Sequence, residues 1–420
     1  LQDHLFDTAQ QHQSPSDHGH FRLAIDRCFV LAGRGTVVTG TAFSGRVSEG
    51  EELFMNGRKI PLRVRSIHAE DRPTKMAKAG QRVALNLAGL SHEEVNRGDW
   101  LRGCPVREVP RFDALLQTSA LEGKDIRSGL EVHLHHGSRD VMARIYPLES
   151  SVLESGKQAL VSVQTVQPIS VCIGDRFVLR DSQARSTIAG GVVLDTQPPS
   201  RGKRTTDRLT LLTEISTLPS QETLHRLLRR GPILEERIRT DWNLTSGQLE
   251  DLLQSATLIR AGSEIFHQET WKILQDRALE LIGVTHIREP EMPGLELQRL
   301  RRQLSPTMSQ EAFALLIDQI ASTNGLLRRG AFVALPSHRI ELEQRDQALW
   351  QSIKPLLAHT AFQPPRVRDI AKELNIAENE IRENLRKVAR VGDVVLVALD
   401  HFFLKTAVSE MAKIVEQLGD

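Results

Sequence analysis

The chain has 420 residues, which is too long for one packed core and excludes a single-domain protein. Its 54 Lys and Arg side chains are balanced by 53 Asp and Glu side chains. A uniformly basic nucleic-acid binder is therefore excluded, and any contact with RNA or DNA must be local. Aromatic residues make up only 4 % of the chain, which argues against a base-stacking surface for single strands.

The cysteines and the hydropathy pattern indicate the cellular compartment of the protein. The three cysteines, Cys28, Cys104 and Cys172, are far apart and form no CxxC pair, which fits a reducing environment. No stretch approaches the roughly 18 consecutive apolar residues that a membrane helix needs. We therefore expect a cytoplasmic protein that makes no contact with a membrane.

The N-terminal stretch has the pattern of a connection. The chain starts at Leu1 rather than at a methionine, and LQDHLFD is typical of the last turns of a helix that runs into the polar segment QQHQSPSDHGH. We expect residues 1–20 to be a linker from a preceding domain.

From residue 21 to about residue 197, short alternating or β-branched runs are separated by glycine. Runs of about four to eight residues, with no helix-length segment between them, predict antiparallel β-barrels or sandwiches. Pro105 and Pro110 mark a seam, so we predict one barrel at 21–104 and a second at 105–200. The runs are FRLAIDRCFVL, GTVVTGTAFSG, PLRVRSIHA, QRVALNLAGL, FDALLQTSA, LEVHLHHG, VMARIYPL, QALVSVQTV and DRFVLR.

Beyond the proline-rich basic linker TQPPSRGKRTTDR the pattern becomes helical and repeats. Each repeat has a helix, a short second helix, a third helix and a two-stranded hairpin, which is typical of a winged helix. The hairpins are expected at 258–268, 326–335 and 394–405, with turns near Gly262, Gly330 and Asp400. We predict three tandem winged-helix units, at 201–270, 271–337 and 338–420.

The last repeat shows the pattern most clearly. We expect its first helix at 344–357, its second in RVRDIAKELNI and its third in AENEIRENLRKVARVG. In the third helix, Ile381, Leu385 and Val388 fall on one face at helical spacing, so they are predicted to be core residues.

The strongest local motif is GRGTVVTG at 33–40. By spacing alone it is as compatible with a β-hairpin that binds no ligand as with a turn that approaches one. Its surroundings carry a resemblance. FRLAIDRCFVLAGRGTVVTGTAFSGRVSEGEEL and the segment through NRGDWL resemble the second domain of translational GTPases such as elongation factor Tu. IDR at 25–27, TAFSG and AGQRVALNLAG at 79–89 are similar to the bacterial selenocysteine-specific elongation factors. RGKR at 201–204, LWQSIKPLL and VRDIAKELNI extend this resemblance over nearly the whole chain.

The resemblance implies a further N-terminal GTPase domain, whose chemistry this sequence lacks. No GxxxxGK[ST] phosphate loop, DxxG or NKxD motif is present. Without them we expect the chain alone not to hydrolyse GTP, and the resemblance places GTP and Mg²⁺ in the missing domain. The family usually carries four winged-helix units, of which the fourth binds the messenger RNA hairpin. Only three are counted here, so we expect the fragment to lack that unit as well.

The resemblance also implies a site for the selenocysteyl group at Asp26, Arg27 and Arg82. A selenol is more acidic than a serine hydroxyl, so a fixed guanidinium in a partly dry pocket would favour it through a charge-assisted hydrogen bond. Asp26 would hold one guanidinium in place. The alternative interpretation is an ordinary Asp–Arg pair on the rim of a barrel.

Two weaker patterns occur beside this site. His133 and His135 share a strand face and could hold a metal ion together. The sequence offers no third ligand at a spacing typical of metal sites, so we predict no metal site. We also predict no catalytic residue. The basic stretches after residue 200 are candidate RNA contacts, although most such runs are solvated helix faces. The candidates are Arg201, Lys203, Arg204, Arg229 and Arg230.

The resemblance implies a monomer that binds selenocysteyl-tRNA and delivers it to a ribosome at a UGA codon with a hairpin in the selenoprotein messenger RNA. The chain would supply the tRNA-binding barrels and a winged-helix spacer. Two alternatives stay open: a general aminoacyl-tRNA carrier or initiation factor, and a winged-helix DNA-binding regulator. The third helix of the second unit, SQEAFALLIDQIAS, has no basic residue, which disfavours the DNA-binding alternative for that unit.

Overall fold

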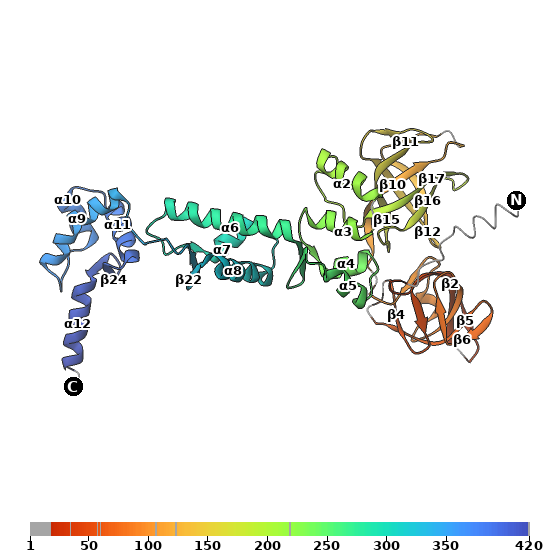
Figure 1. Ribbon diagram of the computed structural model, residues 1–420, viewed down its shortest axis with the longest axis horizontal. Coiled ribbons are helices and arrows are strands. Elements are labelled where there is room, and N and C mark those ends of the chain that lie inside the picture. Colours follow the sequence, from red (N-terminus) through yellow and green to blue (C-terminus); the bar gives the residue numbers. More distant parts are fainter. Residues whose placement is uncertain are drawn as a thin grey trace. The chain divides into compact units, whose positions relative to one another are not determined.

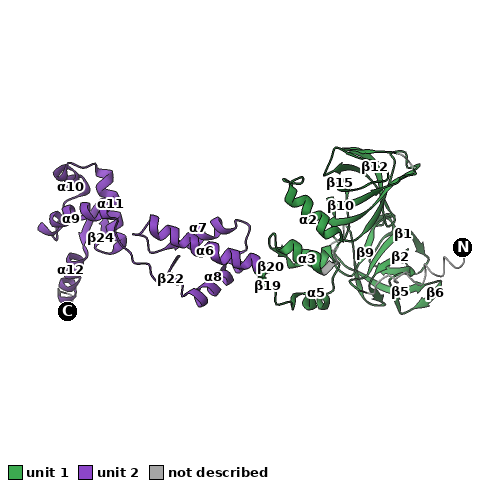
Figure 2. Ribbon diagram, turned by 45° about the horizontal axis from the view of Figure 1, so that its top comes forward, with its two compact units in different colours: residues 1–268 green, residues 269–420 purple. Residues whose placement is uncertain are grey.

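The computed structural model of this protein describes residues 18–418 except 34, 57, 59, 106, 122, 123, 218 and 219. Residues 1–17 of the predicted linker therefore lie outside the described residues. The chain divides into two compact units, residues 1–268 and residues 269–420, which are coloured separately in Figure 2. No described helix is long and apolar enough to cross a membrane.

Barrel 1 forms because alternate residues of its strands point to one core. In β5, for example, Leu62, Val64 and Ile67 are buried while the residues between them are more exposed. The strand order β4-β9-β1-β2-β8-β5 closes through pairing of β4 with β5, and β3 pairs separately with β7. The strands are β1 (Arg22–Leu31), β2 (Gly35–Ser44), β3 (Arg46–Ser48), β4 (Glu52–Met55), β5 (Leu62–Ala69), β6 (Arg72–Thr74), β7 (Met76–Lys78), β8 (Arg82–Ala88) and β9 (Trp100–Arg102), with a 3-10 turn, η1 (His92–Glu94).

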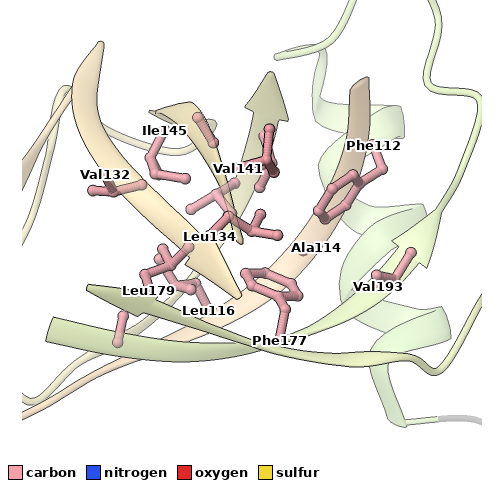
Figure 3. Packing of buried hydrophobic residues seen from close by; sticks show 14 of the residues in the cluster. Phe112, Ala114, Leu116, Val132, Leu134, Val141, Ile145, Phe177, Leu179 and Val193 are labelled. Atoms are coloured by element: carbon pink, nitrogen blue, oxygen red, sulfur yellow. The ribbon is translucent and has the colours of Figure 1, made fainter. Parts of the chain in front are cut away.

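Barrel 2 is a second closed antiparallel barrel, in the order β10-β15-β13-β12-β16-β17. Its core is aliphatic around one aromatic pair, Phe112 and Phe177, whose ring centroids lie 5.5 Å apart in an edge-on arrangement (Figure 3). The strands are β10 (Val109–Thr118), β11 (Ile126–Arg127), β12 (Leu130–His136), β13 (Arg139–Pro147), β14 (Val152–Leu153), β15 (Gln158–Ile169), β16 (Arg176–Arg180) and β17 (Thr187–Asp195).

A helix, α2 (Thr206–Thr217), follows barrel 2 and packs on its outside (Figure 1). Leu211, Leu212 and Ile215 of α2 share a buried cluster with residues of β15 and β17. The first winged helix comes after it, and Leu224 and Leu228 of its first helix belong to a separate core. The elements of this winged helix are α3 (Ser220–Leu228), β18 (Ile233–Leu234), α4 (Glu235–Asp241), α5 (Ser246–Leu253), β19 (Leu258–Ala261) and β20 (Glu264–His267).

The second unit holds two more winged helices. The second winged helix of the chain is built from α6 (Gln268–Arg288), β21 (Leu295–Glu296), α7 (Leu297–Leu304), α8 (Gln310–Asn324), β22 (Leu327–Arg329) and β23 (Phe332–Ala334). The third is built from α9 (Gln344–His359), α10 (Val367–Leu374), α11 (Glu378–Val391), β24 (Val394–Ala398) and β25 (His401–Leu404), and is followed by α12 (Lys405–Leu418).

The three predicted hairpins are confirmed. Their turn residues Gly262, Gly330 and Asp400 all have positive φ, at 61°, 63° and 57°, as tight hairpin turns require. Ile381, Leu385 and Val388 of α11 are fully buried, as their spacing predicts. The expected fold class, two closed antiparallel barrels followed by tandem winged helices, is therefore the observed one.

Candidate functional site

A β-bulge in β1 sets the position of two predicted site residues. Ile25 lies opposite Gly40 and Arg27 lies opposite Thr39, so Asp26 is an extra residue without a partner of its own. Ile25 is buried in the core of barrel 1 and Cys28 packs against that core, although the two are three positions apart. The bulge therefore interrupts the alternation, and neither Asp26 nor Arg27 belongs to this core.

Asp26 is the centre of a small polar cluster across three neighbouring strands. Arg82, at the start of β8, donates two hydrogen bonds to its carboxylate, from Nη1 to Oδ2 at 2.5 Å and from Nη2 to Oδ1 at 3.1 Å. Thr39 of β2 donates a third, from Oγ1 to Oδ1 at 2.8 Å. Sequence reasoning missed Thr39, because only the strand register places it opposite Arg27 and beside Asp26.

The electrostatics of this cluster favour its charged form. Burial by itself would raise the pKa of Asp26, but the hydrogen bonds from Arg82 and Thr39 and the charges of Arg82 and Arg27 outweigh it and lower that pKa. The hydrogen bonds to Asp26 and the charge of Asp26 raise the pKa of Arg82. Two guanidinium groups beside one carboxylate leave one net positive charge, which a neighbouring anion can offset.

The cluster is open to water. The Arg82 side chain is 56 % exposed and that of Asp26 is 23 % exposed. Arg27 is also exposed, and among the described residues it has no hydrogen-bond or salt-bridge partner for its side chain, while its charge acts on Asp26. The structure thus brings Asp26 and Arg82 into direct contact and leaves the donors of Arg27 available to a ligand.

The histidine cluster is divided between two environments. Nδ1 of His133 lies 2.9 Å from Oδ1 of Asp140, and Nε2 of His135 lies 3.9 Å from the same oxygen. His136 is buried instead and bonds to Asp175 at 3.0 Å. Among residues 18–418, with the gaps given above, no group of three or more His, Cys, Asp or Glu side chains is arranged to hold a metal ion.

The candidate RNA-binding cations lie at two places in the first unit. Arg201 and Arg204 are exposed and Lys203 is half-buried, all in the segment between barrel 2 and α2. Arg229 and Arg230 are exposed just after α3.

A buried polar junction, which the sequence does not reveal, joins barrel 1 to barrel 2. Arg22 of β1 donates two hydrogen bonds to Asp175, at 2.8 and 2.6 Å, and lies over the ring of Trp100 at 4.7 Å. Burial would raise the pKa of Asp175, but Arg22 and His136 lower it far below its ordinary range. Because Asp175 stays ionised, the pair persists as pH falls well below neutral.

The same junction reaches the first winged helix. Arg102 of β9 is 1 % exposed, and its Nη2 donates to the Thr240 carbonyl at 3.2 Å and to Oδ1 of Asn243 at 3.1 Å. Asn243 in turn donates from Nδ2 to the His20 carbonyl at 2.9 Å. Barrel 1, barrel 2 and the first winged helix are therefore held together by buried hydrogen bonds, which fixes the platform on which the Asp26 cluster stands.

Comparisons with known proteins follow this domain order. Residues 35–102 match the family model described as elongation factor Tu domain 2, and residues 113–200 match the β-barrel domain of selenocysteine-specific elongation factors. Residues 281–335 match the winged helix of elongation factor SelB, and residues 342–403 match a winged-helix domain of selenocysteine-specific elongation factors.

Whole-chain relatives give the same result. The chain is 32 % identical to the selenocysteine-specific elongation factor of Escherichia coli over its full length, and spans 66 % of that protein. It is 27 % identical to the Haemophilus influenzae protein of the same name over 95 % of the chain and 64 % of that relative. A crystal structure of a bacterial selenocysteine-specific elongation factor shares the fold over the whole chain, with a TM-score of 0.60, 16 % identity and 65 % of that structure covered. The chain belongs to the family of selenocysteine-specific elongation factors.

Proposed function

We propose that this protein binds selenocysteyl-tRNA and delivers it to the ribosome at UGA codons that are followed by a hairpin in the messenger RNA. Barrel 1 selects the amino acid through Arg82 and Arg27, and Asp26 with Thr39 holds Arg82 in place. The observation that carries the proposal is the bidentate pair of hydrogen bonds from Arg82 to Asp26 on an accessible face of barrel 1, in a chain of this family.

The physical basis of selection is charge. An ionised selenol accepts hydrogen bonds from guanidinium groups, whereas a serine hydroxyl brings no charge to offset them. The bidentate hold of Asp26 lowers the conformational freedom of Arg82 before a ligand arrives, so less entropy is lost on binding. A bound aminoacyl end would also cover the exposed part of Arg82 and so strengthen the interaction.

The rest of the proposal follows the family. GTP and Mg²⁺ act in a GTPase domain outside these residues, the ribosome and the messenger RNA hairpin are further partners, and the protein acts in the cytoplasm as a monomer. Arg201, Arg229 and Arg230 remain proposed contacts to RNA.

The winged helices support a role other than reading DNA. Of the four cations on α11, three are held by acidic partners: Arg382 by Asp400 at 2.7 and 2.8 Å, Lys387 by Asp346 at 2.6 Å and Arg390 by Glu291 at 3.3 Å. A helix whose cations are already paired offers little attraction to phosphates.

The test is filter binding with four ligands: selenocysteyl-tRNA, seryl-tRNA on the same tRNA body, a selenoprotein messenger RNA hairpin and duplex DNA. The proposal predicts that selenocysteyl-tRNA binds most tightly. Equal affinity for the two aminoacyl-tRNAs would favour a general carrier, and tightest binding to a specific DNA duplex would favour a regulator.

The pH dependence of this preference is a further prediction. The lowered pKa of Asp26 means that its contribution is present above the ordinary aspartate value and is lost only as pH falls below it. Between about pH 7.5 and about pH 4.5 Asp26 and Arg82 therefore keep their charges, and within this contact the selenol is the group whose charge can change. We expect affinity for selenocysteyl-tRNA to fall toward that for seryl-tRNA over this range, while affinity for seryl-tRNA changes little. A constant ratio in parallel titrations would argue against charge-based selection.

A further inference from the structure

A basic cavity lies on the outside of barrel 2, at the segment that leads into α2. Its volume is about 530 Å³, within the range of ligand pockets. Its floor comes from three adjacent strands, because Arg111 of β10 lies opposite Gln164 of β15, and Ser162 of β15 lies opposite Tyr146 of β13. One wall is the segment Gly202–Thr205.

The lining carries three positive charges and no carboxylate. Arg111, Lys203 and Arg204 line the cavity, and none of the residues around it is Asp or Glu. Within the described part of the chain none of these three cations has a salt-bridge partner. The acid that acts on Lys203 is Asp113, whose side chain is fully buried and bonded to Arg208 at 2.6 Å. The positive charge of the cavity is therefore not offset by a carboxylate of its own lining.

Two of the cations are held in fixed orientations. Nη2 of Arg111 donates to the Pro198 carbonyl at 2.7 Å, and Nη2 of Arg204 donates to the Pro147 carbonyl at 2.9 Å. A guanidinium has five N–H donors, so each keeps others for a ligand. Burial first, and then the charge of Arg111, lower the pKa of Lys203.

We propose that this cavity binds a phosphate group of an RNA backbone, with Arg111, Lys203 and Arg204 as its donors. Planar guanidinium forks beside a lysine match phosphate oxygens. The ring of Tyr146 provides surface, and the exposed side chain of Gln164 provides hydrogen bonds, for the adjoining sugar. The inference deepens the proposed function, since tRNA is the RNA concerned, but it concerns the backbone and not the amino acid.

The test uses the fact that Tyr146 is the chain's single tyrosine. Protein grown with 3-fluorotyrosine has one ¹⁹F resonance, which reports this cavity. We expect deacylated tRNA to shift that resonance, and Lys203→Ala to weaken tRNA binding about five- to tenfold and to reduce the slope of log affinity against log salt by about 1. Lys157→Ala, which removes an exposed lysine of the same barrel, is the matched control and should change neither quantity.

The outcomes separate the two proposals. If deacylated tRNA binds but leaves the Tyr146 resonance unmoved, and Lys203→Ala behaves like Lys157→Ala, the cavity is not an RNA site. If inorganic phosphate moves the resonance and RNA does not, the cavity takes a free anion and the RNA assignment is wrong. If the resonance moves with deacylated tRNA while seryl- and selenocysteyl-tRNA bind equally, the cavity assignment stands and the selection proposed for barrel 1 fails.

Discussion

Replacing Arg82 by alanine is expected to remove most of the preference for selenocysteyl-tRNA over seryl-tRNA. A hydrogen bond to a charged group contributes about 1.5–3 kcal/mol, so the ratio of the two affinities should fall by a factor of about 10 to 150. The loss should appear in the selenocysteyl affinity, because the hydroxyl of serine gains little from the guanidinium. Competition binding with both aminoacyl forms of one tRNA measures it.

Two further variants make this result specific. Arg82→Lys keeps the charge but loses the two-fold bond to Asp26, so we expect an intermediate ratio. Arg72→Ala removes an exposed arginine from β6 of the same barrel and should leave the ratio unchanged. An unchanged ratio in Arg82→Ala itself would mean that the Asp26–Arg82 pair is an ordinary ion pair on the barrel rim.

The second large effect is expected at the contact between barrel 2 and α2. Arg208 of α2 donates from Nη2 to Asp113 at 2.6 Å and to Asp195 at 2.8 Å, and both carboxylates are at most 5 % exposed. Arg208→Ala leaves two buried acids without this partner, which should lower the free energy of unfolding by about 3–5 kcal/mol. Urea unfolding followed by the ¹⁹F signal of fluorotyrosine at Tyr146 reports barrel 2 specifically.

An exposed pair of the same barrel is the control for that measurement. Arg144 and Glu131 lie 2.7 Å apart with side chains 57 % and 56 % exposed, so Arg144→Ala should destabilise barrel 2 far less than Arg208→Ala does. Similar unfolding curves for the two variants would contradict the assignment of Arg208 as a buried structural cation.

The fold could be predicted from sequence where local patterns decide it. Hairpin turns at Gly262, Gly330 and Asp400 and the spacing of hydrophobic residues in α11 are local signals, and each is confirmed. Strand β17 was not among the predicted strands, because Gly190 and Gly191 interrupt its apolar run. A Cβ on Gly191 would lie 2.5 Å from the Phe177 ring, so that glycine serves close packing and does not mark a turn.

The polar contacts that organise the first unit could not be predicted. Arg22 and Asp175 are 153 residues apart, and nothing in composition distinguishes a buried arginine such as Arg22 or Arg102 from a surface one. For the candidate site, resemblance supplied Asp26, Arg27 and Arg82. The bulge that exposes Arg27 and the hydrogen bond from Thr39 needed the strand register.

The most direct test of selection by charge compares three aminoacyl esters of one tRNA: selenocysteyl, cysteyl and seryl. Cysteine is close to selenocysteine in size, but a thiol is a weaker acid than a selenol, so at about pH 5.5, roughly three units below the ordinary cysteine pKa, the thiol is mostly protonated even beside the α-amino group of the ester. The account predicts that selenocysteyl-tRNA binds at least about tenfold more tightly than either of the others. Cysteyl-tRNA binding as tightly as selenocysteyl-tRNA at this pH would show that barrel 1 recognises size and not charge.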